Sequence, residues 1–156
     1  MKLFATAAHP DNIPSHAPDG EAWYGAAPYY TGFTWSQEQI NRFRHHFFIV
    51  QTRINVVSYA AHARCIDVEN FAVTPEEVAA FCAERNRLHG DATVYCSEST
   101  IAEIHAHDPA MDFRLFAAQW DNDPHNRPTW GGKLAWAKQY NDPPGYEPCV
   151  LFADHF

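Results

Sequence analysis

Hydrophobic residues form short runs along this chain, and a helical pattern lies between two of these runs. The first of these two runs covers residues 64–69 and predicts a strand. Thr74-Pro75-Glu76-Glu77 then has the signature of a helix N-terminus, with a capping box and a proline in the first turn. Apolar residues recur at helical spacing over residues 78–88, and Gly90 marks the end of the helix. A second apolar run follows at residues 92–96. The order strand, helix, strand predicts the βα unit of a parallel sheet, and with it an α/β fold.

The rest of the chain predicts further elements of both kinds. Residues 1–33 are irregular and rich in proline, and we expect a strand over 2–7 followed by ordered loops, because the segment also carries many aromatic residues. We further expect a helix from Thr34 or Ser36 to Arg44, a strand over 47–54, a helix from Ser97 or Ser99 to His107, a strand over 113–120, and closing strands over 133–140 and 149–152 separated by a Pro-Pro-Gly turn.

The length and charge of the chain narrow its class. A chain of 156 residues fits a single domain, residues 1–156, and is short for a full eight-stranded α/β barrel, so any barrel here must be trimmed. The net charge of −8 and the scatter of lysines and arginines disfavour nucleic acid as the main partner. The start of the chain does not match a signal peptide, and no apolar run reaches membrane-spanning length. We therefore expect synthesis in the cytoplasm and no membrane span.

The pair Asp67 and Glu69 is the strongest chemical signal. In a strand, residues two apart project from the same face, so both carboxylates are expected in one open cleft with an aromatic side chain nearby. They lie at the carboxyl end of a predicted parallel strand, where α/β enzymes carry their chemistry. Two convergent carboxylates share acid and electrostatic work on a glycosidic bond. The structural alternative is an acidic pair on a solvated surface.

Cysteine and histidine suggest other chemistry that the pattern disfavours. Each of the four cysteines falls in a predicted strand or on the apolar face of a helix, which favours buried, reduced thiols over disulfides. The closest histidine groups, His45-His46 and His105-x-His107, match no zinc motif, so we expect no metal site.

Five segments occur in the order found in glycoside hydrolase family 25 lysozymes. They are Cys65-Ile66-Asp67-Val68-Glu69, Thr74-Pro75-Glu76-Glu77, Thr93-Val94-Tyr95-Cys96-Ser97, Phe116-Ala117-Ala118-Gln119-Trp120-Asp121 and Ala135-Trp136-Ala137-Lys138-Gln139-Tyr140. The resemblance covers residues 34–152 and is closer to short relatives in actinobacteria and their phages, whose Asn-x-x-Asn-Ile-Pro-like segment resembles residues 10–14. It implies a trimmed, irregular (β/α) TIM-like barrel. It also implies cleavage of the β-1,4 bond between N-acetylmuramic acid and N-acetylglucosamine in peptidoglycan.

The resemblance also implies roles for individual residues. Glu69 matches the general acid, and Asp67 matches the carboxylate that steadies the acetamido group of the substrate as it attacks the anomeric carbon. A general acid needs a raised pKa, which a neighbouring carboxylate provides. Tyr95 and Trp120 fall at strand ends, where aromatic faces stack on sugar rings, and core packing is the alternative for both. Asp121 is expected to bind a sugar hydroxyl or to cap a loop. No metal or organic cofactor is implied.

Two positions depart from the family pattern. The inward Asp of the first strand has only His9, Asp11 or Asn12 in its region, and the Asp of the late strand has Glu147 in its place. Two alternatives therefore remain open: a muramidase-like hydrolase, such as a phage lysin, and a catalytically impaired barrel that binds the cell wall or serves as a structural module of a phage virion. The expected partners are peptidoglycan glycan strands and phage structural proteins. Because no separate wall-binding domain is evident, we expect delivery to the cell wall by a phage lysis system or on a phage particle.

Overall fold

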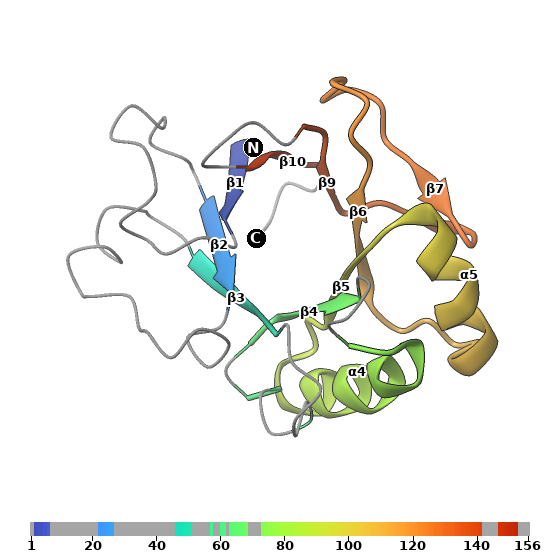
Figure 1. Cartoon of the computed structure of the whole chain (residues 1–156). Helices are drawn as coiled ribbons and strands as arrows, with labels where there is room; N and C mark the ends of the chain where they lie inside the picture. Colours follow the sequence, from blue (N-terminus) through green and yellow to red (C-terminus); the bar gives the residue numbers. More distant parts are fainter. Residues whose placement is uncertain are drawn as a thin grey trace.

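The computed structural model describes residues 2–6, 22–26, 46–50, 57, 60–61, 63–68, 73–141 and 147–152. In this part of the chain the fold is mixed α/β, with a mostly parallel sheet and two helices (Figure 1). The elements are β1 Lys2–Thr6, β2 Ala22–Ala26, β3 His46–Val50, β4 Cys65–Val68, α4 Pro75–His89, β5 Thr93–Cys96, α5 Glu98–His107, β6 Arg114–Ala118, β7 Thr129–Trp130, β8 Lys133–Leu134, β9 Ala137–Gln139 and β10 Glu147–Leu151.

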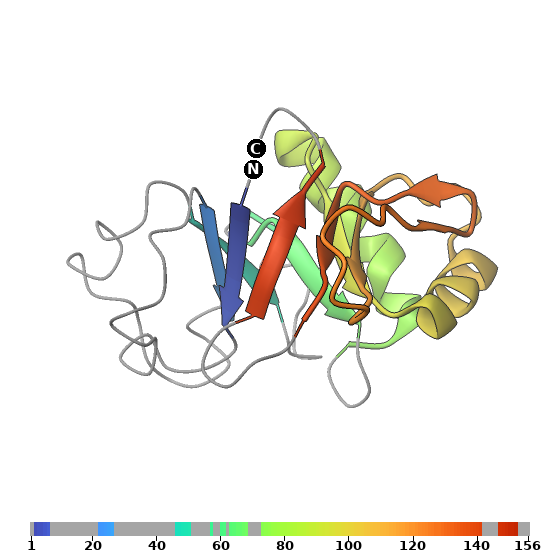
Figure 2. The same ribbon diagram turned by 90° about the horizontal axis from the view of Figure 1, so that it is seen from above.

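Strand pairing runs in the order β1-β10-β9-β6-β5-β4-β3-β2, and β2 pairs in turn with β1. Within this sheet, every pairing that does not involve β10 is parallel. Strand β10 runs antiparallel to both of its neighbours, β1 and β9. Figure 2 shows β1 and β10 side by side and running in opposite directions. The amino end of β10 therefore lies at the edge where the parallel strands have their carboxyl ends.

Helix α4 confirms the predicted βα unit. The backbone N–H of Thr74 donates to Oε2 of Glu77 at 2.9 Å, so the capping box is present, and Pro75 occupies the first turn. At the other end, Gly90 has a φ of 70°, and its N–H donates to the carbonyl of Asn86 at 3.0 Å. This left-handed conformation favours glycine, which explains why the helix ends there. Strands β4 and β5 on either side of α4 pair in parallel, as predicted.

Helix α5 repeats the same construction between β5 and β6. Ser97 is its N-cap, and the side-chain oxygen of Ser97 accepts a hydrogen bond from the N–H of Thr100 at 3.4 Å. The cap is therefore Ser97 rather than Ser99, and the helix ends at His107 as expected. Strands β5 and β6, which α5 connects, pair in parallel. The predicted βα unit is therefore followed by a second one.

The two helices lie on the outside of β4, β5 and β6, as Figure 1 shows. Their buried faces include Val78 and Phe81 of α4 and Ile101 and Ile104 of α5, which pack in one apolar cluster with alternate residues of the strands. Leu88, which continues the helical pattern of α4, is 38% exposed because it lies in the last turn, at the rim of the packed face.

Other elements differ from the expectations. Strand β2 lies in the segment expected to form loops, and the strand expected over 133–140 is divided into β8 and β9. The hairpin of β7 and β8 turns through Gly131 and Gly132, both with positive φ, and Nζ of Lys133 donates to the carbonyl of Met111 at 2.5 Å. The helix expected over 34–44, the end of the strand expected over 47–54 and the Pro-Pro-Gly turn lie outside the described residues.

Candidate functional site

The candidate site is built on a row of residues from three neighbouring parallel strands. Asp67 of β4 is in register with Tyr95 of β5, which is in register with Phe116 of β6. Residues in register on adjacent strands project from the same face of a sheet, so the three side chains share the face that α4 and α5 do not cover. The rings of Tyr95 and Phe116 meet edge to face, with 5.1 Å between their centroids. The aromatic neighbour predicted for Asp67 is therefore present.

Asp67 is buried, with 3% of its surface exposed, which differs from the open cleft that we expected. The physical reason is an apolar layer on the same face of the sheet. This layer consists of Cys65, Tyr95, Phe116, Trp136, Ala137, Cys149 and Leu151. Burial raises the pKa of the Cys65 thiol well above its ordinary value, and the neighbouring charge of Asp67 raises it further. Cys65 is thus a neutral thiol beside the carboxylate.

Glu69 and Asp11, two of the predicted site residues, lie outside the described residues, as do His9 and Asn12. Strand β4 ends at Val68, immediately before Glu69. The role of Glu69 as the acid beside Asp67 therefore remains a prediction based on strand alternation.

Tyr95 is 5% exposed, and its hydroxyl is held by Gln139. Its hydroxyl donates a hydrogen bond to Oε1 of Gln139 on β9, and Nε2 of Gln139 donates to the carbonyl of Asn141 at 3.4 Å. This geometry matches the core-packing alternative for Tyr95, which forms a wall beside Asp67 rather than an open stacking surface. Gln139 was missed at the sequence level, although its alternation with Ala137 across Lys138 places both on the same face of the strand.

Trp120 and Asp121 follow β6 at the carboxyl edge of the sheet and have different surroundings. The side chain of Trp120 is exposed by 59%, which is the opposite of core packing. The carboxylate of Asp121 accepts hydrogen bonds from Nζ of Lys138 at 2.6 Å, the N–H of Asp123 at 3.0 Å and Nδ2 of Asn126 at 2.7 Å. Burial raises the pKa of Asp121, but these hydrogen bonds outweigh it and lower the pKa to about 2. Asp121 therefore organises a loop, and its contact with a sugar remains a prediction.

Glu147 is the first residue of β10, and its backbone is in register with Ala5 of β1. Because β10 runs antiparallel to its neighbours, its first residue lies at the edge where the parallel strands end. Asp67, Trp120 and Glu147 thus belong to one edge of the sheet.

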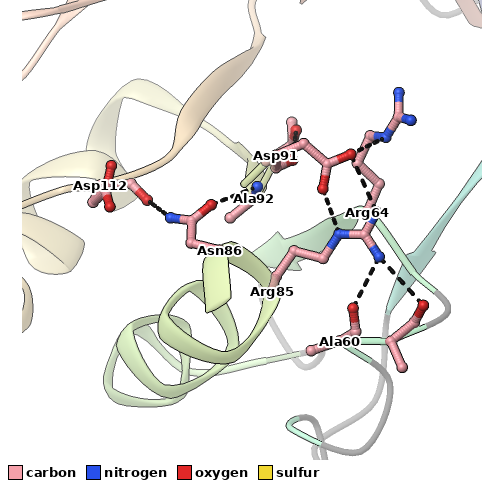
Figure 3. A network of polar contacts seen from close by, with 9 residues as sticks. Ala60, Arg64, Arg85, Asn86, Asp91, Ala92 and Asp112 are labelled. Atoms are coloured by element: carbon pink, nitrogen blue, oxygen red, sulfur yellow. Dashed lines mark hydrogen bonds and ion pairs between the residues drawn. The ribbon is translucent and has the colours of Figure 1, made fainter. Parts of the chain in front are cut away.

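The opposite edge carries a network of ion pairs (Figure 3). Asp91, just before β5, accepts hydrogen bonds from Arg85 at 2.6 and 3.1 Å and pairs with Arg64 at 2.8 Å. Arg85 also donates to the carbonyl of Ala60 at 2.9 Å. Burial raises the pKa of Asp91, but the two guanidinium groups outweigh it, so the pKa is lowered. Asn86 links the same end of α4 to the starts of β5 and β6. This edge stabilises the fold, whereas the candidate chemistry lies at the other.

The cysteines are part of the packed core. All four cysteines are buried and form no disulfide, as the pattern predicted. Within the described part of the chain, no group of three His, Cys, Asp or Glu is placed to hold a metal ion. None of the described helices is long and apolar enough to cross a membrane.

Comparison with protein-family models, with curated proteins and with solved structures finds no match.

Proposed function

We propose that this chain is a peptidoglycan-degrading, muramidase-like glycoside hydrolase, and that its ring of strand pairings is a trimmed, irregular (β/α) TIM-like barrel. The position of Asp67 carries this proposal. Its carboxylate lies near the carboxyl end of a parallel strand, on the face away from the helices, and in register with Tyr95. We propose that the alternation of β4 continues for one residue beyond Val68, which puts Glu69 on the same face. Most glycoside hydrolases use a pair of carboxyl groups to cleave the glycosidic bond, and Asp67 and Glu69 would supply this pair.

In the proposed reaction, the carboxylic acid of Glu69 gives its proton to the glycosidic oxygen as the bond to the anomeric carbon breaks. The acetamido oxygen of the substrate attacks the anomeric carbon, and the carboxylate of Asp67 stabilises the positive charge that develops on this group. Water then opens the resulting ring and gives a proton to Glu69, which restores the acid. The products are two shorter glycans, one with a new reducing end.

Trp120 is proposed to bind a sugar ring beside this pair. Its side chain is exposed by 59% at the same edge of the sheet. An exposed indole offers a flat apolar surface to the apolar face of a pyranose ring. Glu147, also at this edge, and Asp11, in the segment that follows β1, are proposed to bind sugar hydroxyls.

The burial of Asp67 favours a second candidate function. A carboxylate with 3% of its surface exposed offers a substrate little area to contact. In this second candidate, the chain binds glycan through Trp120 without cleaving it and serves as a wall-binding module, for example on a phage particle. Such a module needs the exposed aromatic residue but not the acid.

Incubation of the purified chain with purified peptidoglycan tests the first candidate. We expect new reducing ends to appear, and we expect Asp67→Asn to slow their release by about 10²–10³ because an electrostatic stabiliser is lost. Asp112→Asn is the matched control, because Asp112 is exposed at the far edge of the sheet, before β6. Full activity of Asp67→Asn would refute the assignment of Asp67.

Binding measurements separate the two candidates. Trp120→Ala should weaken binding to insoluble peptidoglycan, whereas Leu134→Ala, which removes a comparably exposed apolar side chain from the β7–β8 hairpin, should not. Binding that depends on Trp120 with no release of reducing ends would select the wall-binding module.

A further inference from the structure

We propose that Lys138 is a positioning residue whose buried ammonium group fixes the loop of residues 119–126, the Trp120 loop, and thereby holds Trp120 in place for glycan. The inference rests on the proposed function of Trp120 and adds a residue that the family resemblance does not assign. Lys138 lies in β9, next to β6, and its side chain is completely buried. A lysine with no exposed surface is unusual, because burial of a charge is costly unless the charge is fully paired.

The ammonium group of Lys138 is fully paired by the Trp120 loop. Its Nζ donates to Oδ1 of Asp121 at 2.6 Å, to the carbonyl of Asp123 at 2.9 Å and to the carbonyl of Asn126 at 3.0 Å. An ammonium group has three N–H donors, so each donor has one oxygen. The three oxygens come from one loop and converge on one cation, much as ligand oxygens converge on a metal ion.

The loop also bonds to itself around this centre. The second carboxylate oxygen of Asp121 accepts from Nδ2 of Asn126 at 2.7 Å, and Oδ1 of Asp123 accepts from the N–H of His125 at 2.8 Å. Without a cation, a carboxylate oxygen and two carbonyl oxygens would face one another and repel. The arrangement of the loop therefore depends on the charge of Lys138.

We call Lys138 and its three oxygen partners the Lys138 lock. Two backbone hydrogen bonds hold the segment on either side of Trp120, next to this lock. The N–H of Gln119 donates to the carbonyl of Gln139 at 3.0 Å, and the N–H of Asn122 donates to the carbonyl of Tyr140 at 2.8 Å. Asn122 has a φ of 59°, a left-handed conformation that asparagine accepts more readily than most residues. Trp120 is thus exposed on a backbone that is fixed on both sides, and a preorganised side chain loses less entropy when it binds.

A purely structural role does not require a lysine at this position. A well-packed apolar side chain often replaces a buried ion pair at no cost in stability, whereas an ion pair specifies one geometry. Lys138 therefore determines where the Trp120 loop lies, beyond filling space between β9 and the loop.

The test replaces Lys138 by methionine, which has similar size but no charge, and uses Lys133→Met as the matched control. Lys133 donates to the carbonyl of Met111 beneath the β7–β8 hairpin and not to the Trp120 loop. In Lys138→Met we expect amide exchange of Asp123 and His125 to accelerate at least about tenfold, while the amides of β4 and β5 keep their protection. The control should leave exchange in the Trp120 loop unchanged.

Glycan affinity is the second measurement, with a tetrasaccharide of N-acetylglucosamine and N-acetylmuramic acid as the probe. We expect Lys138→Met to raise its Kd about tenfold, to the value of Trp120→Ala, at a temperature where each variant is folded. In an active enzyme KM should rise and kcat should stay the same. If Lys138→Met does not fold, Asp121→Asn removes the opposing charge from a partly exposed position and should accelerate amide exchange in the Trp120 loop in the same way.

The outcomes distinguish this inference from the proposed function. Unchanged loop exchange in both Lys138→Met and Asp121→Asn would overturn the lock. Accelerated exchange with glycan affinity retained, in a protein whose Trp120→Ala variant loses affinity, would overturn the positioning role. If Lys138→Met loosens the loop but the wild-type protein does not bind the tetrasaccharide, the proposed function fails and the positioning role fails with it, although the lock itself stands.

Discussion

The hydroxyl of Tyr95 donates a hydrogen bond to Oε1 of Gln139, although β6 lies between the strands that carry these two residues. A side chain reaches across an intervening strand only where the sheet curves toward that face. The bond therefore ties β5 to β9 around Phe116 and stabilises the wall beside Asp67.

Loss of this hydroxyl should destabilise the fold. Tyr95→Phe leaves Oε1 of Gln139 buried without its donor, and we expect the free energy of unfolding to fall by about 1–3 kcal/mol, measured by urea denaturation. In a Gln139→Leu background the same substitution should cost much less, because its partner is already gone. Equal costs in the two backgrounds would mean that the bond contributes nothing.

The ion-pair network at the opposite edge predicts a contrast between two arginines of α4. Arg85 is 8% exposed and binds both Asp91 and the carbonyl of Ala60, so Arg85→Met should lower the free energy of unfolding by about 3 kcal/mol. Among the described residues, Arg87 pairs only with Glu84 on the helix surface, and its side chain is 65% exposed. We therefore expect Arg87→Met to leave the urea midpoint unchanged. Similar midpoints for the two variants would contradict the structural role of Arg85.

The low pKa of Asp121 predicts a pH dependence of stability. Its pKa in the folded protein is about 2, below the value of an ordinary Asp. The contribution of Asp121 is therefore complete above about pH 4 and is lost as the pH falls through about 2. Denaturation midpoints between about pH 2 and 5 should fall less steeply for Asp121→Asn than for the wild type. Asp112→Asn, a change on an exposed side chain, should keep the steep wild-type profile.

Local signals account for the elements that were predicted correctly. The N-terminus of α4 depends on Thr74, Pro75 and Glu77, and its end depends on Gly90. All of these residues lie in the helix or directly beside it in the sequence. Strand β2 depends instead on its partners β1 and β3, which are far from it in the sequence. Its aromatic and small residues do not alternate clearly enough to distinguish a strand from an ordered loop.

The candidate site shows the same division. The pairing of Asp67 with Tyr95 follows from two predicted strands that are adjacent in the chain, and the aromatic neighbour was expected. The burial of Lys138 was not predictable, because lysine is usually exposed and its partners come from a loop whose path depends on the β6–β9 pairing. Sequence spacing alone therefore predicted that Asp67 has an aromatic neighbour, but not how the Trp120 loop is held.

The release of reducing ends from purified peptidoglycan by Glu69→Gln, beside the wild type, tests the central claim most directly. Removal of a general acid should slow cleavage by about 10²–10⁴ while the denaturation midpoint stays at the wild-type value. Glu103→Gln, a matched change on the exposed face of α5, should keep full activity. Cleavage by Glu69→Gln at the wild-type rate would contradict the assignment of Glu69 as the acid and, with it, the proposed hydrolase mechanism.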